Sequence, residues 1–273
     1  MKRPAFLLCL LLAACSTVPG TGRSRLAPTM SLDQQMSLGN QAYKETLSKA
    51  RIIETGPEAE MVRRIGERIA KSPLLAKLFP EAAGKFKWQF TLIDAPKTIN
   101  AWALPGGKTA VYSGLLKVTG DEDSLAMVMG HEITHAVAEH GAERMTQQTG
   151  FAGLLGLADL ALGSSKGVDP KSKELIMTGL GVGGQVGILL PFSRTHESEA
   201  DELGLYFAAD AGYDPRAAIG LWQRMSELGG DKPPEFLSTH PSDGHRIERL
   251  QKEMHQAEKY YRRAQRRMGK GLN

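Results

Sequence analysis

The stretch GHEITHAVAEH, residues 130–140, decides how this chain is interpreted. His131 and His135 are four residues apart, so on a helix they project from one face and can bind one tetrahedral metal ion together. Glu132 follows His131 directly, and its carboxylate can reach a water on that metal, as a general base must. The alternative is an amphipathic helix whose histidines lie in the core or on the surface. The pattern favours a catalytic zinc site.

A catalytic zinc site also needs a third protein ligand and one open position for water. His140 is five residues past His135 and rotated off the ligand face, so we expect it to pack or to support a ligand. The segment FSRTHESEADELG, residues 192–204, offers Glu197 and Asp201, which share a face if the segment is helical. Glu197 can ligate the metal, while Asp201 can accept the outer N–H of a zinc-bound histidine.

The alternative for this segment is a solvated acidic helix. We expect Glu199 and Glu202 to be solvated in either case, and Glu199, two residues from Glu197, to point away from the metal. His196 and His245 adjoin motif residues, but the sequence assigns them no role.

Three motifs together resemble one peptidase family: HEITH at 131–135, ESEAD at 197–201 and THP at 239–241. Over about residues 31–255 the chain is similar to the HtpX and CAAX-prenyl-protease family of gluzincin zinc metallopeptidases. Its size makes it most similar to the LoiP-like periplasmic lipoproteins and to the protease core of BepA without the repeat domain. The resemblance implies one Zn²⁺ per chain, with Glu197 as the third ligand and Asp201 behind the ligands.

The resemblance extends to further positions. Asn100 and Ala101 match an edge strand to which an extended substrate adds by backbone hydrogen bonds; the alternative is an ordinary sheet edge. His240 would be catalytic, either by stabilising the oxyanion or by occupying the open zinc position as a gate. Arg246 matches a family arginine that would contact the substrate or the oxyanion, and its alternative is a surface ion pair.

The first residues, MKRPAFLLCLLLAAC, predict a lipoprotein signal peptide over residues 1–14. Lys2 and Arg3 precede a short apolar run that is too short to span a bilayer, and Leu12 to Cys15 look like a lipobox. The alternatives are an ordinary cleaved signal and a short retained anchor. Lipidated Cys15 and a flexible tether over 15–30 would follow. This pattern places the protein in the periplasm of a Gram-negative bacterium, on the inner leaflet of the outer membrane.

Composition restricts the remaining classes. The formal net charge is +4, and removing Lys2 and Arg3 leaves +2, so the whole molecule offers no case for nucleic-acid binding. Cys9 and Cys15 are the two cysteines; the first leaves with the signal and the second is lipidated, so a metal must use His and carboxylate ligands.

Periodicity predicts an α+β fold: a mainly helical zincin-like domain over residues 31–255, with a small β-sheet whose edge strand borders the active site. We expect helices at about 32–48 and from Pro57, a strand at 86–94, and a hairpin over 99–114 that turns at Pro105 to Gly107. One long helix from Asp121 to about Gln148 should carry HEITH.

Two segments remain outside this scheme. Residues 175–193 lack charge, but their glycines and Pro191 weaken a membrane span, so we expect 150–193 to be a helical or loop cover over a cleft. The basic tail, residues 256–273, is expected to be a solvated helix end, with contact to anionic lipid or a partner as the alternative.

The sequence therefore predicts a zinc endopeptidase that acts on unfolded or misassembled envelope proteins, such as outer-membrane proteins. In this hypothesis Glu132 takes a proton from a zinc-activated water and passes it to the leaving amine. The alternatives are an assembly factor or chaperone-like lipoprotein with little proteolytic activity, and a narrow peptidase that trims one partner.

Overall fold

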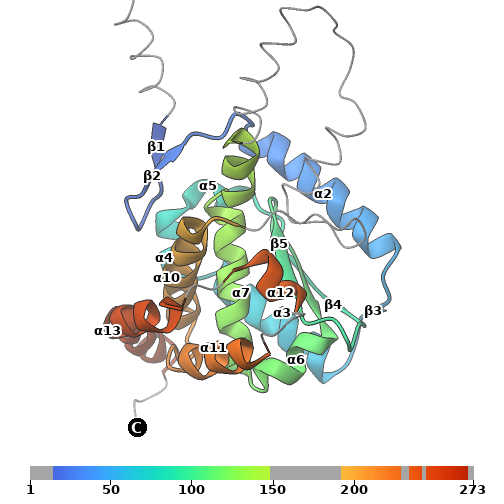
Figure 1. Cartoon of the computed structure of the whole chain (residues 1–273), viewed down its shortest axis with the longest axis vertical. Helices are drawn as coiled ribbons and strands as arrows, with labels where there is room; N and C mark the ends of the chain where they lie inside the picture. Colours follow the sequence, from blue (N-terminus) through green and yellow to red (C-terminus); the bar gives the residue numbers. More distant parts are fainter. Residues whose placement is uncertain (1–14, 148–191, 229–233, 242–243, 270–273) are drawn as a thin grey trace, which may run out of the picture.

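A computed structural model describes residues 15–147, 192–228, 234–241 and 244–269. Helix α7 (Glu122–Val137) stands at the centre of the molecule, with a small sheet on one side and helices α10 (Arg194–Asp210) and α13 (Arg246–Arg267) on the other (Figure 1). HEITH lies on α7 and ESEAD on α10. The expected mainly helical, zincin-like α+β class is confirmed.

The sheet contains four strands in the order β3 (Ile52–Ile53), β4 (Gln89–Ile93), β6 (Lys108–Tyr112) and β5 (Ala101–Leu104). β4 and β6 are parallel, and the other pairs are antiparallel. The predicted hairpin turn is confirmed, because Leu104 pairs with Lys108 and the intervening Gly106 and Gly107 have φ angles of 91° and 79°. Within the described chain β5 is an edge strand, and it packs against α7.

The helices that cover the sheet start where the sequence signals them. α2 (Leu32–Ser48) begins with a capping box between Ser31 and Gln34, and α3 (Pro57–Ala70) begins at its proline. The short helices α4 (Pro73–Leu78) and α5 (Pro80–Lys85) follow. α6 (Ser113–Thr119) then leads into α7, which Asp121 caps by accepting from the Ser124 amide.

Helices α7 and α10 approach each other most closely at two glycines. A Cβ built on Gly130 would lie 2.5 Å from the Gly204 carbonyl oxygen, and a Cβ on Gly204 would lie 2.6 Å from the His131 amide nitrogen. A larger residue at either position would push the helices apart. This contact holds HEITH against ESEAD.

The long helix predicted through about Gln148 is interrupted. α7 ends at Val137, Ala138 and Glu139 form a turn, and helix resumes over residues 140–147. Glu139 has a φ of 59°, a left-handed value that helix periodicity in the sequence does not reveal. The prediction of one continuous helix to about Gln148 was therefore wrong. The turn also changes the direction in which His140 projects.

Residues 15–30, expected to be a flexible tether, contain a hairpin. β1 (Cys15–Thr17) pairs antiparallel with β2 (Ser24–Leu26), and Val18 is buried. Arg25 donates to the Ala138 carbonyl and pairs with Glu139 at 2.9 Å. The structure thus differs from the expectation, because the hairpin is bound to the turn that follows α7.

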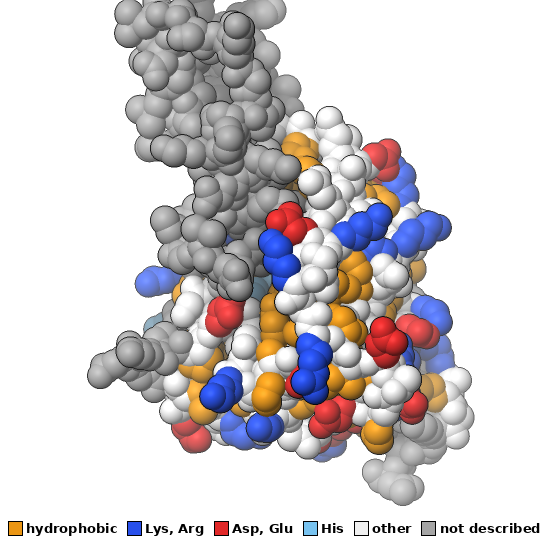
Figure 2. All heavy atoms as spheres, turned by 90° about the vertical axis from the view of Figure 1, so that its right-hand side faces the viewer, with side chains coloured by type: hydrophobic (Ala, Val, Ile, Leu, Met, Phe, Trp, Pro, Cys, Tyr) orange, Lys and Arg blue, Asp and Glu red, His pale blue; other side chains and the backbone are white. Residues whose placement is uncertain are grey.

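The chain ends in α11 (Ala217–Glu227), α12 (Glu235–Thr239) and α13, which continues past the expected domain limit at residue 255 and packs on α10. No helix among the described residues is long and apolar enough to cross a membrane. The predicted cover at 150–193 lies outside them, apart from Phe192 and Ser193. Figure 2 shows a face on which acidic and basic side chains are interspersed, in agreement with the balanced charge of the chain.

Candidate metal centre

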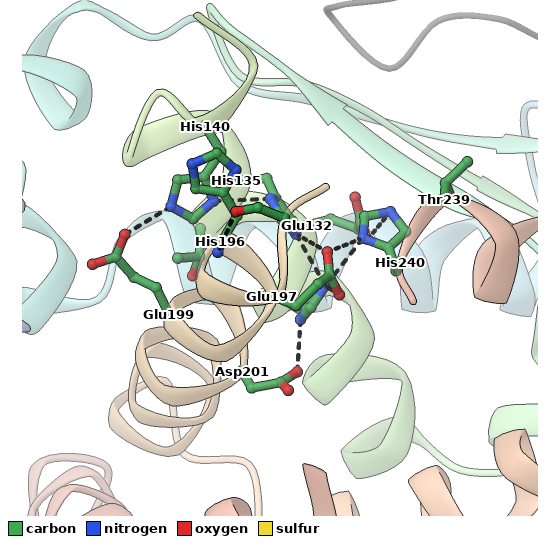
Figure 3. A network of polar contacts seen from close by, with 12 residues as sticks. Glu132, His135, His140, His196, Glu197, Glu199, Asp201, Thr239 and His240 are labelled. Carbon is green, nitrogen blue, oxygen red and sulfur yellow. Dashed lines mark hydrogen bonds and ion pairs between the residues drawn. The ribbon is translucent and has the colours of Figure 1, made fainter. Parts of the chain in front are cut away.

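Four buried side chains from three parts of the fold converge beside α7 (Figure 3). His131 and His135 come from α7, Glu197 from the first turn of α10, and His240 from the position that ends α12. None of the four is more than 3% exposed. The three ligands predicted from the sequence are therefore brought together, and His240 completes a fourth corner.

The spacing of the donor atoms tests whether this group fits zinc. The Nε2 atoms of His131 and His135 are 3.1 Å apart, and the Glu197 carboxylate lies 3.4 Å from each. His240 Nδ1 is 3.3 Å from His131 Nε2 and 3.1 Å from Glu197 Oε1. Donors bound at 2.0–2.1 Å to a tetrahedral zinc lie ~3.3 Å from one another. The donor set thus fits one Zn²⁺ in spacing and in chemistry.

His131 is oriented by Asp201, as the sequence predicted. Its Nδ1 lies 3.0 Å from Asp201 Oδ1, which leaves Nε2 facing the other ligand atoms. Arg246 stands behind this pair, donating from Nε to Asp201 at 2.7 Å and from Nη2 to Glu197 at 2.5 Å. Its guanidinium also lies 3.9 Å from the centre of the Trp222 ring.

Arg246 therefore contradicts one of its two sequence interpretations, the surface ion pair, while a contact with the substrate or the oxyanion stays a prediction. It is 2% exposed, so it is not a surface ion pair. Two of its nitrogens bind the carboxylates of Glu197 and Asp201, so it holds these two side chains in place from behind. Its place on the first turn of α13 explains this role, because α13 packs on α10.

His135 is contacted by His140, which the sequence predicted to pack or to support a ligand, and His140 is in turn bound by Glu199, which the sequence placed in solvent. His140 Nδ1 lies 2.9 Å from His135 Nδ1, and His140 Nε2 lies 2.9 Å from Glu199 Oε2. Glu199 is 3% exposed and is also bound by Arg23. The expectation of a solvated Glu199 was wrong, although it does point away from the metal ligands (Figure 3).

His196 is buried as well. Its Nε2 lies 3.1 Å from Glu143, and its ring stacks on that of His140 at 4.6 Å. No motif marked Glu143 or Arg23, because their partners are far away in the sequence. The one signal in the sequence was that His140 and His196 lie next to the motifs, because histidines that become buried need hydrogen-bond partners nearby.

Glu132 and His240 face each other across the centre. His240 Nε2 is 3.4 Å from Glu132 Oε1, an oxygen that accepts no hydrogen bond from the described residues. The His240 ring lies between Phe192, at 5.3 Å, and Phe236, at 4.7 Å, with both pairs stacked. A backbone hydrogen bond from Phe192 to Thr239 fixes this segment beside the start of α10.

The electrostatics leave the four side chains in different protonation states. Burial opposes protonation of His131, but Glu197 and Asp201 raise its pKa to about 9, so a metal has to displace a proton from this ring. Burial lowers the pKa of His135 well below its ordinary value, so its ring is neutral. Burial opposes ionisation of Glu197, but His240 and His131 hold its pKa well below the usual range. Burial raises the pKa of Glu132, which suits a group that must take up a proton.

The edge strand β5 starts next to the His240 segment. The Ile99 carbonyl accepts from the Phe236 amide at 3.2 Å, which joins β5 to α12. The Asn100 side chain accepts from the Ala101 amide at 2.8 Å. The Tyr112 amide donates to the Asn100 carbonyl, so by strand alternation Ala101 and Ala103 direct their backbone groups away from β6, although both residues are buried.

Comparison with known proteins points to one peptidase family. The family model described as "Peptidase family M48" matches residues 58–254 of this chain. A Schizosaccharomyces pombe protein named mitochondrial metalloendopeptidase OMA1 is 35% identical over 246 residues, covering 88% of this chain and 67% of its own length. The beta-barrel assembly-enhancing protease of Yersinia pestis is 30% identical over 244 residues, covering 87% of this chain and 47% of its own. The Escherichia coli protein of that name is 28% identical over 235 residues, or 84% and 45%. The chain thus spans about half the length of these bacterial relatives.

Proposed function

The chain belongs to peptidase family M48 as a zinc metalloendopeptidase, and from this premise we propose that it hydrolyses unfolded or misassembled proteins of the bacterial envelope. One observation supports the chemistry above all others. A buried His131–His135–Glu197 set with zinc spacing lies beside Glu132, a carboxylate whose pKa is raised by burial. A purely structural zinc site has no need for such a base.

Zinc, when bound, supplies Lewis acidity that polarises a peptide carbonyl and activates water. Glu132 takes the proton of the attacking water and delivers it to the leaving amine nitrogen. His131, His135 and Glu197 hold the metal, while Asp201 and Arg246 keep the ligands in place. His240 acts as a gate, because it lies at the fourth position around the metal and its Nε2 is 3.4 Å from Glu132 Oε1.

The substrate adds to β5 as an extended strand. The Ala101 carbonyl and the backbone groups of Ala103 supply main-chain hydrogen bonds, which give affinity with broad sequence tolerance, while the Ala101 amide is bound by the Asn100 side chain. Such tolerance suits unfolded proteins. The name of the relatives from Yersinia pestis and Escherichia coli, beta-barrel assembly-enhancing protease, supports outer-membrane proteins as the substrate class.

Location rests on the sequence of the first fifteen residues. A signal peptide over residues 1–14 and a lipid on Cys15 would hold the enzyme at the inner leaflet of the outer membrane, as in the LoiP-like lipoproteins. The OMA1 relatives are named mitochondrial, so the lipobox carries this part of the proposal alone. Labelling with a radioactive fatty acid, with Cys15→Ala as control, tests it; an unlabelled parent protein contradicts it.

The chemistry is tested with Glu132→Gln. This variant should bind one zinc per chain but lose about 10³-fold of casein hydrolysis, because the glutamine amide cannot take the proton of the attacking water. Cleavage by the parent should disappear with a chelator and return with zinc. Zinc binding without cleavage in the parent would favour the assembly-factor alternative, and full activity in Glu132→Gln would exclude this mechanism.

The role of His240 is tested separately. His240→Ala should raise the rate of casein cleavage, because it clears the fourth corner and frees Glu132. A large loss of activity would instead favour stabilisation of the oxyanion, worth about 10²–10³-fold in rate for a single donor.

A further inference from the structure

The second zinc histidine is held through an indirect connection that reaches the N-terminal hairpin. We propose that His140 and Glu199 are positioning residues for His135, and that Arg23, from the β1–β2 hairpin, completes this relay. The proposal rests on the zinc function above. It makes the hairpin next to Cys15 a part of the metal centre.

The first link is the contact between two ring nitrogens. His135 can bind zinc through Nε2 only if its proton is on Nδ1. Nδ1–H then has to donate to a nearby acceptor, and His140 Nδ1 lies 2.9 Å away. Both rings are at most 3% exposed, so water does not compete for this bond.

The second link fixes the state of His140. Glu199 Oε2 lies 2.9 Å from His140 Nε2, and a carboxylate can only accept, so Nε2 donates. In a neutral ring the other nitrogen, Nδ1, is then an acceptor. The carboxylate of Glu199 thereby sets the proton position of His135 through His140, as Asp201 does directly for His131.

The third link holds Glu199 in place. Arg23 donates from Nε to Glu199 at 2.9 Å and binds both oxygens of Glu143 at 2.9 and 2.7 Å. Thr21 of the same hairpin also donates to Glu199. One guanidinium thus joins two buried carboxylates, and without it Glu199 and Glu143 would lose their shared cation and keep only their histidine and hydroxyl partners.

The break after α7 makes the relay possible. In a continuous helix, residues five apart do not share a face, so His140 would not reach His135. The left-handed Glu139 turns the chain, and its carboxylate is held by Arg25 at 2.9 Å and by Gln35 at 2.6 Å. A residue in strained backbone that the surrounding structure holds so firmly is typical of a functional constraint.

The test measures zinc affinity by chelator competition, with thermal unfolding alongside. His140→Leu, which removes the acceptor at similar volume, should weaken zinc binding by about 10–100-fold. Glu199→Ala should weaken it by roughly 10-fold, and His140→Asn, whose amide oxygen can accept from His135, should recover part of the loss.

Glu143→Ala is the matched control. Glu143 is 2% exposed, pairs with His196 and shares Arg23 with Glu199, but its carboxylate binds His196 and Arg23 and not a ring nitrogen of His140. The variant should lose thermal stability much as Glu199→Ala does, yet keep zinc affinity within about 3-fold, since its effect is not on a metal ligand. The absorption spectrum of the cobalt-substituted protein should likewise change in His140→Leu and stay unchanged in Glu143→Ala.

Equal losses of zinc affinity in Glu143→Ala and Glu199→Ala would show a packing effect and overturn the relay. Unchanged affinity in His140→Leu, in a parent protein that binds zinc, would overturn the relay alone. A parent that binds no zinc would overturn the proposed function, and the relay with it.

Discussion

The two histidines of α7 in the proposed zinc site are supported in different ways. His131 meets a carboxylate directly, and Asp201 is in turn held by Arg246, which is 2% exposed. His135 meets a second histidine first, and its carboxylate, Glu199, is held by an arginine whose side chain is 16% exposed. Each arm ends in an arginine shared by two carboxylates. One arm is therefore part of the core, and the other depends on a hairpin at the edge of the domain.

The two arms should therefore differ in what they control. The core arm should control both the stability of the fold and the metal, and the hairpin arm mainly how tightly the metal is held. Loss of the core arm should disturb the fold and the metal together, because Arg246 binds both the ligand Glu197 and Asp201. Loss of the hairpin arm should loosen the metal while the core remains. A partner or membrane that pulls on the hairpin would thus act on His135 and leave His131 in place.

The largest expected effect follows the removal of Arg246. Arg246→Leu leaves the carboxylates of Glu197 and Asp201 buried without their cation, and should lower the free energy of unfolding by about 3–5 kcal/mol. Urea unfolding of the zinc-free protein measures it. Arg23→Leu is the control from the other arm and should lose clearly less, since its site is partly exposed; equal losses would contradict the division into a core arm and a hairpin arm.

A smaller effect is expected when the core arm is weakened at its carboxylate. Asp201→Asn removes the charge that holds the Nδ1 proton of His131, and should weaken zinc binding by about 10–100-fold, or about 1.4–2.7 kcal/mol. Chelator competition measures it. Because Asp201 contacts its ligand directly, the loss should be at least that of Glu199→Ala; the reverse order would mean that the hairpin arm dominates.

The sequence predicted the metal ligands and Asp201, and it predicted that His140 packs or supports a ligand, but it missed the role of the arginine in both arms. The difference has one physical reason. The spacings of His131 to His135 and of Glu197 to Asp201 are single helical turns, so local periodicity is enough to place them on common faces. Arg23 meets its carboxylates across 120 and 176 residues, a distance at which no periodicity operates.

The break at Glu139 explains the second failure. A non-glycine residue in left-handed backbone carries no sequence signal here, since Arg25 and Gln35 hold it in place through tertiary contacts. On a continuous helix His140 would lie off the face that carries His131 and His135, as the sequence predicted. The prediction that Glu199 is solvated was wrong for the same reason. Residues of the hairpin bind its carboxylate, and such tertiary contacts leave no signal in the local sequence.

The smallest expected effect is a dependence of the hairpin arm on acid. Arg23 and His196 face Glu143, with Glu199 beyond the arginine, and against the cost of burial they lower the Glu143 pKa from 4.5 to about 2. A lowered folded-state pKa stabilises the protein above the unfolded value, so this contribution is present above pH 4.5 and is lost as the pH falls toward 2. Glu143→Gln has no such proton to bind, so between pH 6 and pH 3 the parent should lose about 1–2 kcal/mol more unfolding free energy than this variant. Urea unfolding of both proteins without zinc isolates the contribution of Glu143 to stability, because the groups of the core arm then titrate equally in the two proteins. Parallel stability curves over that range would mean that Arg23 does not hold Glu143 in solution, and the hairpin arm would then end at Glu199.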